Sequence, residues 1–286
     1  MAYQERFSRN LGWVTELEQE ELRGKCVAIA GLGGVGGRHL ETLTRLGIGR
    51  FTLSDLDVFE LANVNRQAGA SQSTMGQPKI EVMTDRALDI NPDLVINSEF
   101  HQGINAANVE AFLEGADVYV DGLDFFAVRE RCAVFAACAK LGIPAVTAAP
   151  LGMSVALLNF LPGGVTFEEY FRLEGHDEVE QLRRFYCGLA PASLQAPYLR
   201  DPSTIDLKNH KGPSKPMGVD LCAGVAGTQV LKILLDRNDP PIIAAPEGLQ
   251  FDAYRYAFVR TRWTPWALQD PAEPLRVGAE AVTVES

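Results

Sequence analysis

Two cations downstream of a glycine-rich loop, Arg66 and Lys79, are the residues of this chain whose types and spacing best suit chemistry. Both follow the second predicted strand, where their side chains could reach a triphosphate bound at the loop. Arginine can bind phosphate oxygens through a planar fork, and lysine supplies a compact positive charge. A plain dehydrogenase needs no such pair, because NAD has no γ-phosphate to hold or release. Taken singly, each could also be a solvated surface cation.

The glycine-rich loop, residues 31–37, directly follows the apolar stretch 27–30. A buried strand that feeds a tight turn and then opens a helix is the usual cradle for a nucleotide. Glycine lets the backbone approach a phosphate without a Cβ in the way, and a helix N-terminus offers free N–H groups and partial positive charge. Alone, such a loop would suit NAD, FAD or ATP.

Aspartates at the predicted strand ends could complete this site. Asp55 lies about 20 residues beyond the loop, where an acid accepts the ribose hydroxyls, although it could also only cap a turn. Asp57 is more typical of the turn role. Asp121 and Asp124 end the fourth strand, and carboxylates beside a triphosphate suggest a Mg²⁺ site. We favour Asp124 for the metal, and it is also placed to be the N-cap of the next helix.

Alternating strands and helices must position these residues. Apolar patterns predict strands at 25–30, 50–54, 94–98, 116–121 and 143–147, with helices between them at 34–46, 78–90, 105–113 and 125–141. This alternation predicts an α/β, Rossmann-like fold, a doubly wound and mostly parallel sheet with helices on both faces. Ligands of such sheets bind beyond the carboxyl ends of the strands, where the loop, Asp55 and Asp124 all fall.

The second half of the chain is less regular and predicts a C-terminal α+β extension. A strand at 153–161 precedes an irregular helix at 166–189, an apolar helix at 218–235, and strands at 248–251 and 254–260. Residues 190–217 show no periodicity, and loops this long are usually functional or disordered. We divide the chain into an arm and helix (1–24), a nucleotide-binding domain (25–162), an irregular crossover or substrate region (163–217), a helix and strands completing the same fold (218–268) and a flexible tail (269–286).

Composition narrows the function classes. The chain has 26 Lys+Arg against 37 Asp+Glu, a net charge of −11, so we expect no nucleic-acid contact, and any anion site must be built locally. The N-terminus carries no signal-peptide pattern, and no apolar run approaches ~20 residues, so we expect no membrane span and a cytoplasmic, reducing location. In such a location, we predict that Cys26, Cys132 and Cys138 are buried and act as small apolar residues.

Seven short segments form a specific combination in this order: 6–10 (RFSRN), 31–36 (GLGGVG), 55–57 (DLD), 63–67 (NVNRQ), 76–79 (GQPK), 91–92 (NP) and 121–124 (DGLD), the last with Arg129. The combination resembles the ThiF/MoeB/HesA family of ATP-dependent adenylyltransferases, the bacterial relatives of ubiquitin-activating enzymes. The likeness runs from about residue 6 to about residue 160 and resumes weakly in 218–235.

The resemblance implies that a carboxylate attacks the α-phosphate of ATP, giving an acyl-adenylate and pyrophosphate. The acid would be the C-terminus or a side chain of a small ubiquitin-like protein or a peptide. Arg9 matches the arginine that relatives insert into the neighbouring subunit's ATP site, so residues 1–24 would contact a second copy in a homodimer. The resemblance implies that Asp124 holds Mg²⁺ and that the nucleotide is bound by Gly31, Gly33, Gly34, Gly36, Asp55, Asn63, Arg66, Lys79 and Asp124. We include Asp57 among the nucleotide-binding residues.

The chain also departs from the family. Relatives usually carry two CxxC pairs for a structural zinc, which this sequence lacks, so we expect no such zinc. The family's Asp-Asn pair is Asp124-Phe125 here, which suggests an altered acyl group. Many relatives capture the acyl group on a cysteine. Cys187 is better placed for exposure than Cys222, although structural burial is the favoured interpretation for it.

Two other functions stay open. A dinucleotide-dependent oxidoreductase using NAD or FAD would fit the glycine loop and Asp55, but it fits Arg9, Arg66 and Lys79 poorly. A non-catalytic member of the family would act only as a binding partner, but such chains usually lose the arginine and lysine set.

Overall fold

The protein, seen here as a computed structural model, is described over residues 2–207 and 209–262, so the predicted tail at 269–286 lies outside the described residues. Its centre is an eight-stranded sheet in the order β3-β2-β1-β4-β5-β6-β7-β8. The first five strands pair in parallel and the last three pair antiparallel, which confirms the Rossmann-like prediction. The strands are β1 (Cys26–Ala30), β2 (Arg50–Ser54), β3 (Val95–Phe100), β4 (Val118–Asp121), β5 (Ala145–Leu151), β6 (Ser154–Phe160), β7 (Glu247–Asp252) and β8 (Ala257–Arg262).

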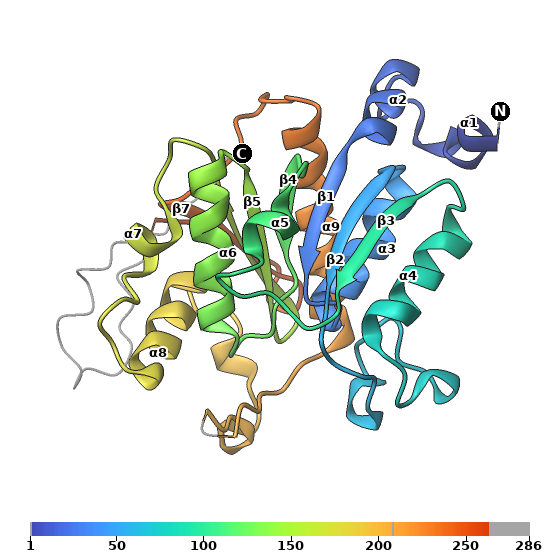
Figure 1. Ribbon diagram of the computed structural model, residues 1–286. Coiled ribbons are helices and arrows are strands. Elements are labelled where there is room, and N and C mark those ends of the chain that lie inside the picture. The colour runs from blue at the N-terminus through green and yellow to red at the C-terminus, as the bar shows by residue number, and fades with distance from the viewer. Residues whose placement is uncertain (1, 208, 263–286) are drawn as a thin grey trace.

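Helices cover both faces of this sheet (Figure 1). One face carries α3 (Gly34–Leu46), α4 (Lys79–Ile90) and α9 (Pro216–Leu234), and the other carries α5 (Val109–Leu113), α6 (Val128–Leu141), α7 (Phe167–Phe171) and α8 (Glu178–Leu189). Strand β1 shows why two cores form, because successive side chains alternate between the faces of a strand. Val27 and Ile29 enter the core under α3, whereas Ala28 and Ala30 enter the core under α6.

The N-terminal arm, with α1 (Ala2–Arg6) and α2 (Glu16–Gly24), lies at the amino ends of the strands. Tyr3 donates its hydroxyl to the Gly47 carbonyl oxygen at 2.6 Å, and Asn10 Nδ2 donates to the Leu46 carbonyl oxygen at 3.1 Å. Both acceptors are at the end of α3, whose first turn is the glycine loop. The arm is therefore at the opposite edge of the sheet from that loop.

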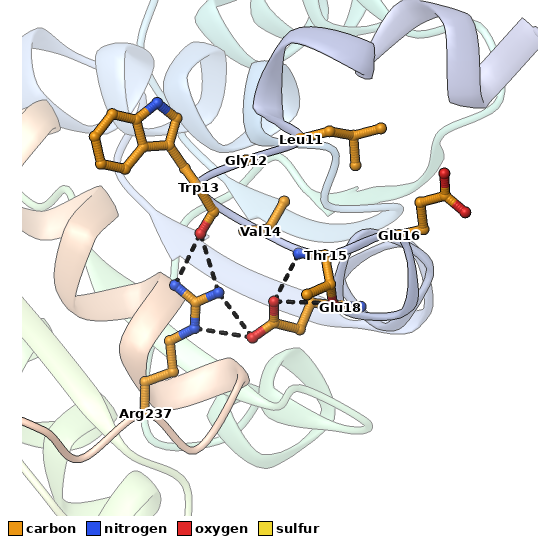
Figure 2. Close-up of a pocket in the computed structure, with 8 residues that line it drawn as sticks. All are labelled: Leu11, Gly12, Trp13, Val14, Thr15, Glu16, Glu18 and Arg237. Carbon is orange, nitrogen blue, oxygen red and sulfur yellow. Dashed lines mark hydrogen bonds and ion pairs between the residues drawn. The ribbon is translucent and has the colours of Figure 1, made fainter.

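A shallow hollow of about 570 Å³ lies beside this arm, between residues 11–18 and Arg237. Figure 2 shows the Arg237 guanidinium bound to the Trp13 carbonyl oxygen and to the Glu18 carboxylate. The indole of Trp13 is 86% exposed. Because Arg237 follows the last turn of α9, the hollow lies far from the carboxyl ends of the strands and is no part of the predicted site.

The structure corrects several predicted boundaries. The irregular helix at 166–189 is two helices, because Arg172 takes a left-handed φ of 51° after α7 and Asp177 caps the start of α8. The helices expected at 105 and 125 begin at Val109 and Val128, since residues before them form turns. The last strand starts at Ala257 rather than at residue 254, which lies in the turn after β7.

Helix α9 is long and apolar enough to cross a membrane by length and composition alone. In this fold it packs against α3, β5 and β6 and buries Cys222, Ala226 and Val230. Those contacts make it a core helix of the sheet.

His39, on the inner face of α3, is a buried ionisable residue that the sequence did not single out. Neither ring nitrogen has a hydrogen-bond partner among the described residues. Burial lowers the pKa of His39 to about 4, with the Asp121 carboxylate partly opposing that shift. The folded protein therefore holds this imidazole neutral.

We expect His39 to make stability depend on pH in the weakly acidic range. The unfolded chain takes up this proton near pH 6.5 and the folded chain only near pH 4. The free energy of unfolding should therefore fall as pH drops between those values, by up to about 1.4 kcal/mol per pH unit. Urea unfolding at pH 7, 6 and 5 should show a shallower decline for His39→Leu than for wild type, with exposed His101→Leu as control. Equal declines in all three proteins would contradict this assignment.

Candidate functional site

The candidate site lies where the loop after β1 meets the loop after β4, at the carboxyl edge of the sheet. Gly31 has a left-handed φ of +83°, and a Cβ there would lie 2.3 Å from the Gly122 carbonyl oxygen. A Cβ at Gly36 would lie 1.8 Å from the Gly31 carbonyl oxygen. The two loops therefore pack backbone against backbone, and no larger residue fits at these positions.

Gly33 and Gly34 are different, because protein atoms leave room beside them. A Cβ at Gly33 would meet only the Gln67 side chain, at 3.5 Å, and one at Gly34 would meet the Val219 side chain at 3.4 Å. Gly33 is the N-cap of α3, whose first-turn N–H groups have no partner within the helix. The open backbone here is suited to an anion, and close approach of a ligand explains the glycines that packing does not require.

Asp55 holds the loop in place. Its Oδ2 accepts a hydrogen bond from the Leu32 N–H at 2.6 Å, and its Oδ1 accepts one from the Asp57 N–H at 2.8 Å. Burial raises the pKa of Asp55, while these two N–H groups and the Lys79 charge act to lower it. The turn interpretation of Asp55 is therefore confirmed, and its contact with the ribose hydroxyls stays a prediction.

Lys79 joins the same network at the start of α4. Its side chain is buried, and Nζ lies 2.9 Å from Asp57 Oδ2. Asp57 is therefore the partner that holds this ammonium group, in addition to its turn role. Hydrogen bonds run without a break from Leu32 through Asp55 and Asp57 to Lys79.

Arg66 also lies beside the loop, with its Cγ 3.9 Å from the position that a Cβ would take at Gly34. Its Nη1 donates to the Ala62 carbonyl oxygen at 3.0 Å and to Asn65 Oδ1 at 2.9 Å. No carboxylate in the described part of the chain forms an ion pair with it. Asn63 uses its Oδ1 to accept from the Glu60 N–H, which leaves its amide N–H groups for another acceptor. Arg66 thus brings to the site a positive charge that no described carboxylate pairs.

The two aspartates after β4 have separate roles. Asp121 is buried, with its Oδ2 bound to Arg131 Nε at 2.8 Å and to Thr147 Oγ1 at 2.8 Å, and its Oδ1 bound to the Leu123 N–H. Asp124 is exposed and uses only its Oδ1, which accepts from the Phe126 N–H at 3.0 Å. Asp124 is not the N-cap of α6, because that helix begins later, after Ala127.

The carboxylates at this edge of the sheet differ in how well they suit Mg²⁺. Within residues 2–207 and 209–262, no group of three or more His, Cys, Asp or Glu side chains converges on one point. Mg²⁺ is usually held by one or two carboxylates together with substrate phosphates and water. Asp124, with one carboxylate oxygen unused beside the loop, fits that arrangement, and Asp121 does not.

Sequence reasoning missed two residues. Arg131 is buried against Asp121, with its guanidinium 4.6 Å from the Phe185 ring centre, whereas Arg129 of the matched motif is exposed. The helical spacing of Val128, Arg131 and Val134 on one buried face was the signal for Arg131. Gln67 lies beside Gly33 with its Oε1 buried and without a partner among the described residues; it ends the matched segment 63–67, but no role was assigned to it.

Two predicted residues lie outside this group. Arg9 is exposed on the arm, in the 3₁₀ turn η1 (Ser8–Asn10), at the other edge of the sheet. Cys187 is only 3% exposed, which confirms the favoured interpretation of structural burial over a catalytic role. Burial raises the pKa of the Cys187 thiol, so its surroundings do not favour a thiolate nucleophile.

The sequence model of the ThiF family matches residues 7–270. The tRNA threonylcarbamoyladenosine dehydratase of Bacillus subtilis (strain 168) is 35% identical over 142 residues, which are 49% of this chain and 55% of that protein. The molybdopterin-synthase adenylyltransferase of Escherichia coli (strain K12) is 32% identical over 161 residues, 56% of this chain and 64% of that protein. The matched segments thus span less than two thirds of these relatives.

Solved structures share the fold. E. coli tRNA N6-threonylcarbamoyladenosine dehydratase, TcdA, in complex with ATP, aligns with a TM-score of 0.61 and 22% identity over 84% of this chain and 97% of that chain. E. coli MccB with MccA-N7isoASN aligns with a TM-score of 0.68 and 19% identity over 91% of this chain and 71% of that chain. At these identities the likeness concerns the fold alone.

The two kinds of glycine should respond differently to alanine. We expect Gly33→Ala to lose at most about 1 kcal/mol of stability, the usual range for an N-cap change, and Gly36→Ala to lose about 1–3 kcal/mol or more through overpacking. Gly33→Ala should still raise the Kd for ATP at least about tenfold, because the methyl group displaces phosphate from charge-assisted hydrogen bonds. Thermal unfolding measures the change in stability, and calorimetric ATP titration measures the change in Kd. Wild-type ATP affinity in folded Gly33→Ala would contradict the assignment.

Proposed function

This chain belongs to the ThiF family, and on that premise we propose that it is an ATP-dependent adenylyltransferase that activates a carboxylate. The observation that carries the proposal is the unpaired charge of Arg66 beside the open backbone of Gly33 and Gly34, together with Lys79, which Asp57 holds. A dinucleotide would use the same loop and Asp55, but it would leave these cations without a role. The oxidoreductase alternative therefore lacks a supporting observation.

The reaction follows from where the charge lies. A carboxylate oxygen attacks the α-phosphorus of ATP, the bond from that phosphorus to the bridging oxygen of the β-phosphate breaks, and pyrophosphate leaves. Two anions must approach each other, so cations fixed in advance supply most of the acceleration. Lys79 is already oriented by Asp57, and Arg66 by Ala62 and Asn65, so neither has to reorganise during the step.

The other site residues bind rather than react. We assign the phosphates to Gly31, Gly33, Gly34 and Gly36, the ribose to Asp55, and a further phosphate contact to Asn63. Asp124 would hold Mg²⁺, which when bound neutralises charge on the phosphates. Gln67 is suited to donate its amide N–H beside Gly33.

The nature of the acid is also a proposal. MccB is solved with MccA-N7isoASN, and one relative is a molybdopterin-synthase adenylyltransferase, so relatives handle more than one kind of substrate. We propose the carboxylate of a peptide or of a small ubiquitin-like protein as the acyl donor. Residues 190–217 could hold its extended tail at low entropic cost.

The five unpaired cysteines support a reducing, cytoplasmic location.

We further propose a homodimer in which Arg9 of one copy acts at the nucleotide site of the other. Arg9 cannot serve its own site, because the arm is fixed to the end of α3 and the loop forms its beginning. A helix of 13 residues places those ends about 20 Å apart.

Adenylation is tested by exchange of labelled pyrophosphate into ATP in the presence of candidate peptides and small proteins. We expect carboxylate-dependent exchange in the wild type and a loss of ~10²–10³ in rate for Lys79→Met and for Asp124→Asn, the range for removing one group that stabilises transition-state charge. Exposed Lys140→Met is the control, since its partner Glu110 lies far from the loop. Exchange that Lys79→Met leaves intact would overturn the proposal.

The homodimer is tested by mixing two inactive variants. Arg9→Ala and Lys79→Met should each be inactive alone, whereas equal amounts, unfolded and refolded together, should recover about a quarter of wild-type exchange. Half of the dimers formed are then mixed, and each mixed dimer holds one intact site. Sedimentation should show a dimer throughout. No recovery in a verified mixed dimer would rule out Arg9 acting between copies.

A further inference from the structure

Residues 209–215, here named the crossing segment, pass over the carboxyl edge of the sheet just before α9 begins. We propose that this segment is a lid over the glycine loop, latched by His210 stacked on Phe126, which must open for a nucleotide to enter or leave. The proposal rests on the proposed function only in taking ATP as the ligand.

Two contacts fix the path of the segment. Asn65, in the loop after β2, donates its Nδ2 to the Ser214 carbonyl oxygen at 3.1 Å. Phe126, in the loop after β4, stacks on His210 with ring centres 4.7 Å apart and planes 13° apart. Strand β1 lies between β2 and β4 in the sheet, so the two anchors lie on opposite sides of the glycine loop.

Chain length agrees with this path. Strands separated by one strand are about 9.5 Å apart, and four residues span at most about 14 Å. The residues from His210 to Ser214 can therefore reach from one anchor to the other over the loop. Figure 1 shows the chain passing beneath the lower ends of the strands on its way into α9.

The latch is small and exposed. His210 Nε2 lies 3.4 Å from Glu178 Oε1 at the start of α8, and both side chains are more than half exposed. Backbone hydrogen bonds of 2.9 Å join Asp206 and Lys211 in both directions, and Lys211 directly follows His210. A single aromatic contact changes an equilibrium by about two- to tenfold. The latch is therefore weak enough to open during turnover.

A latch that does not touch the ligand has a kinetic signature. It sets the fraction of time that the site is open, so removing it should speed association and dissociation of the nucleotide by the same factor. A residue that binds the nucleotide would instead change mainly the dissociation rate.

The first test measures binding of a fluorescent ATP analogue by stopped flow. We expect His210→Ala to raise both rate constants two- to tenfold and to change Kd less than twofold. His176→Ala is the matched control, because His176 is an exposed histidine in the turn just before α8. Unchanged rates, or a faster dissociation alone, would overturn the lid.

A second test switches the latch within one protein. Phe126→Cys combined with His210→Cys replaces the two stacked rings, whose centres lie 4.7 Å apart, with thiols, and mild oxidation is used to join them in a disulfide. We expect slower association when oxidised, by at least tenfold, and association at or above the wild-type rate after reduction. The single variants control for oxidation of other thiols. Equal rates in a verified disulfide form and in the reduced form would overturn the lid.

These measurements separate the two proposals. Nucleotide rates that follow the latch, in a protein that exchanges no pyrophosphate with any acid, would keep the lid and remove adenylation. Exchange that continues unchanged when the disulfide is closed would keep adenylation and remove the lid.

Discussion

No side chain fits where the loop after β1 touches the loop after β4, and the arrangement of the site depends on this contact. Gly31, Gly36 and Gly122 bring three backbone segments together at distances that a Cβ would prevent. That approach sets α3 directly against the sheet and brings the turn containing Asp124 beside the first turn of the helix. It also places Phe126 on the flank of the loop opposite Asn65, which is why a short segment can join the two sides.

A strongly acidic chain builds its anion site by pairing some charges and leaving others unpaired. Asp121 is neutralised by Arg131 in the interior, where removing either partner would leave a costly buried charge. Lys79 is buried but held by the exposed Asp57, so its positive charge stays close to the loop. Arg66 has only neutral acceptors. Arg66 is therefore a cation without an ion-pair partner among the described residues, in a chain whose net charge is −11.

The parallel half of the fold could be predicted from sequence because its strands are short apolar runs that alternate with amphipathic helices. The convergence of Gly31, Asp55 and Asp124 followed from a general rule about strand ends. What sequence could not supply depended on local turns and distant contacts. Asp124 was expected to cap α6, but its carboxylate binds the Phe126 N–H in a turn, and the helix begins at Val128. That shift turns Arg131, rather than Arg129, toward Asp121. The stacking of His210 on Phe126 depends on tertiary structure, because the two residues are far apart in the sequence.

The contrast between the glycines of this loop bears on how such sequences diverge. Gly31, Gly36 and Gly122 are demanded by packing, so a descendant that stopped handling nucleotides would still keep them in order to fold. Packing against neighbouring side chains does not require glycine at position 33, so in that descendant other residues could replace it. A residue other than glycine at this position, in a loop that keeps the other glycines, therefore indicates loss of nucleotide binding. Inactive members of this fold could be told from active ones by sequence alone.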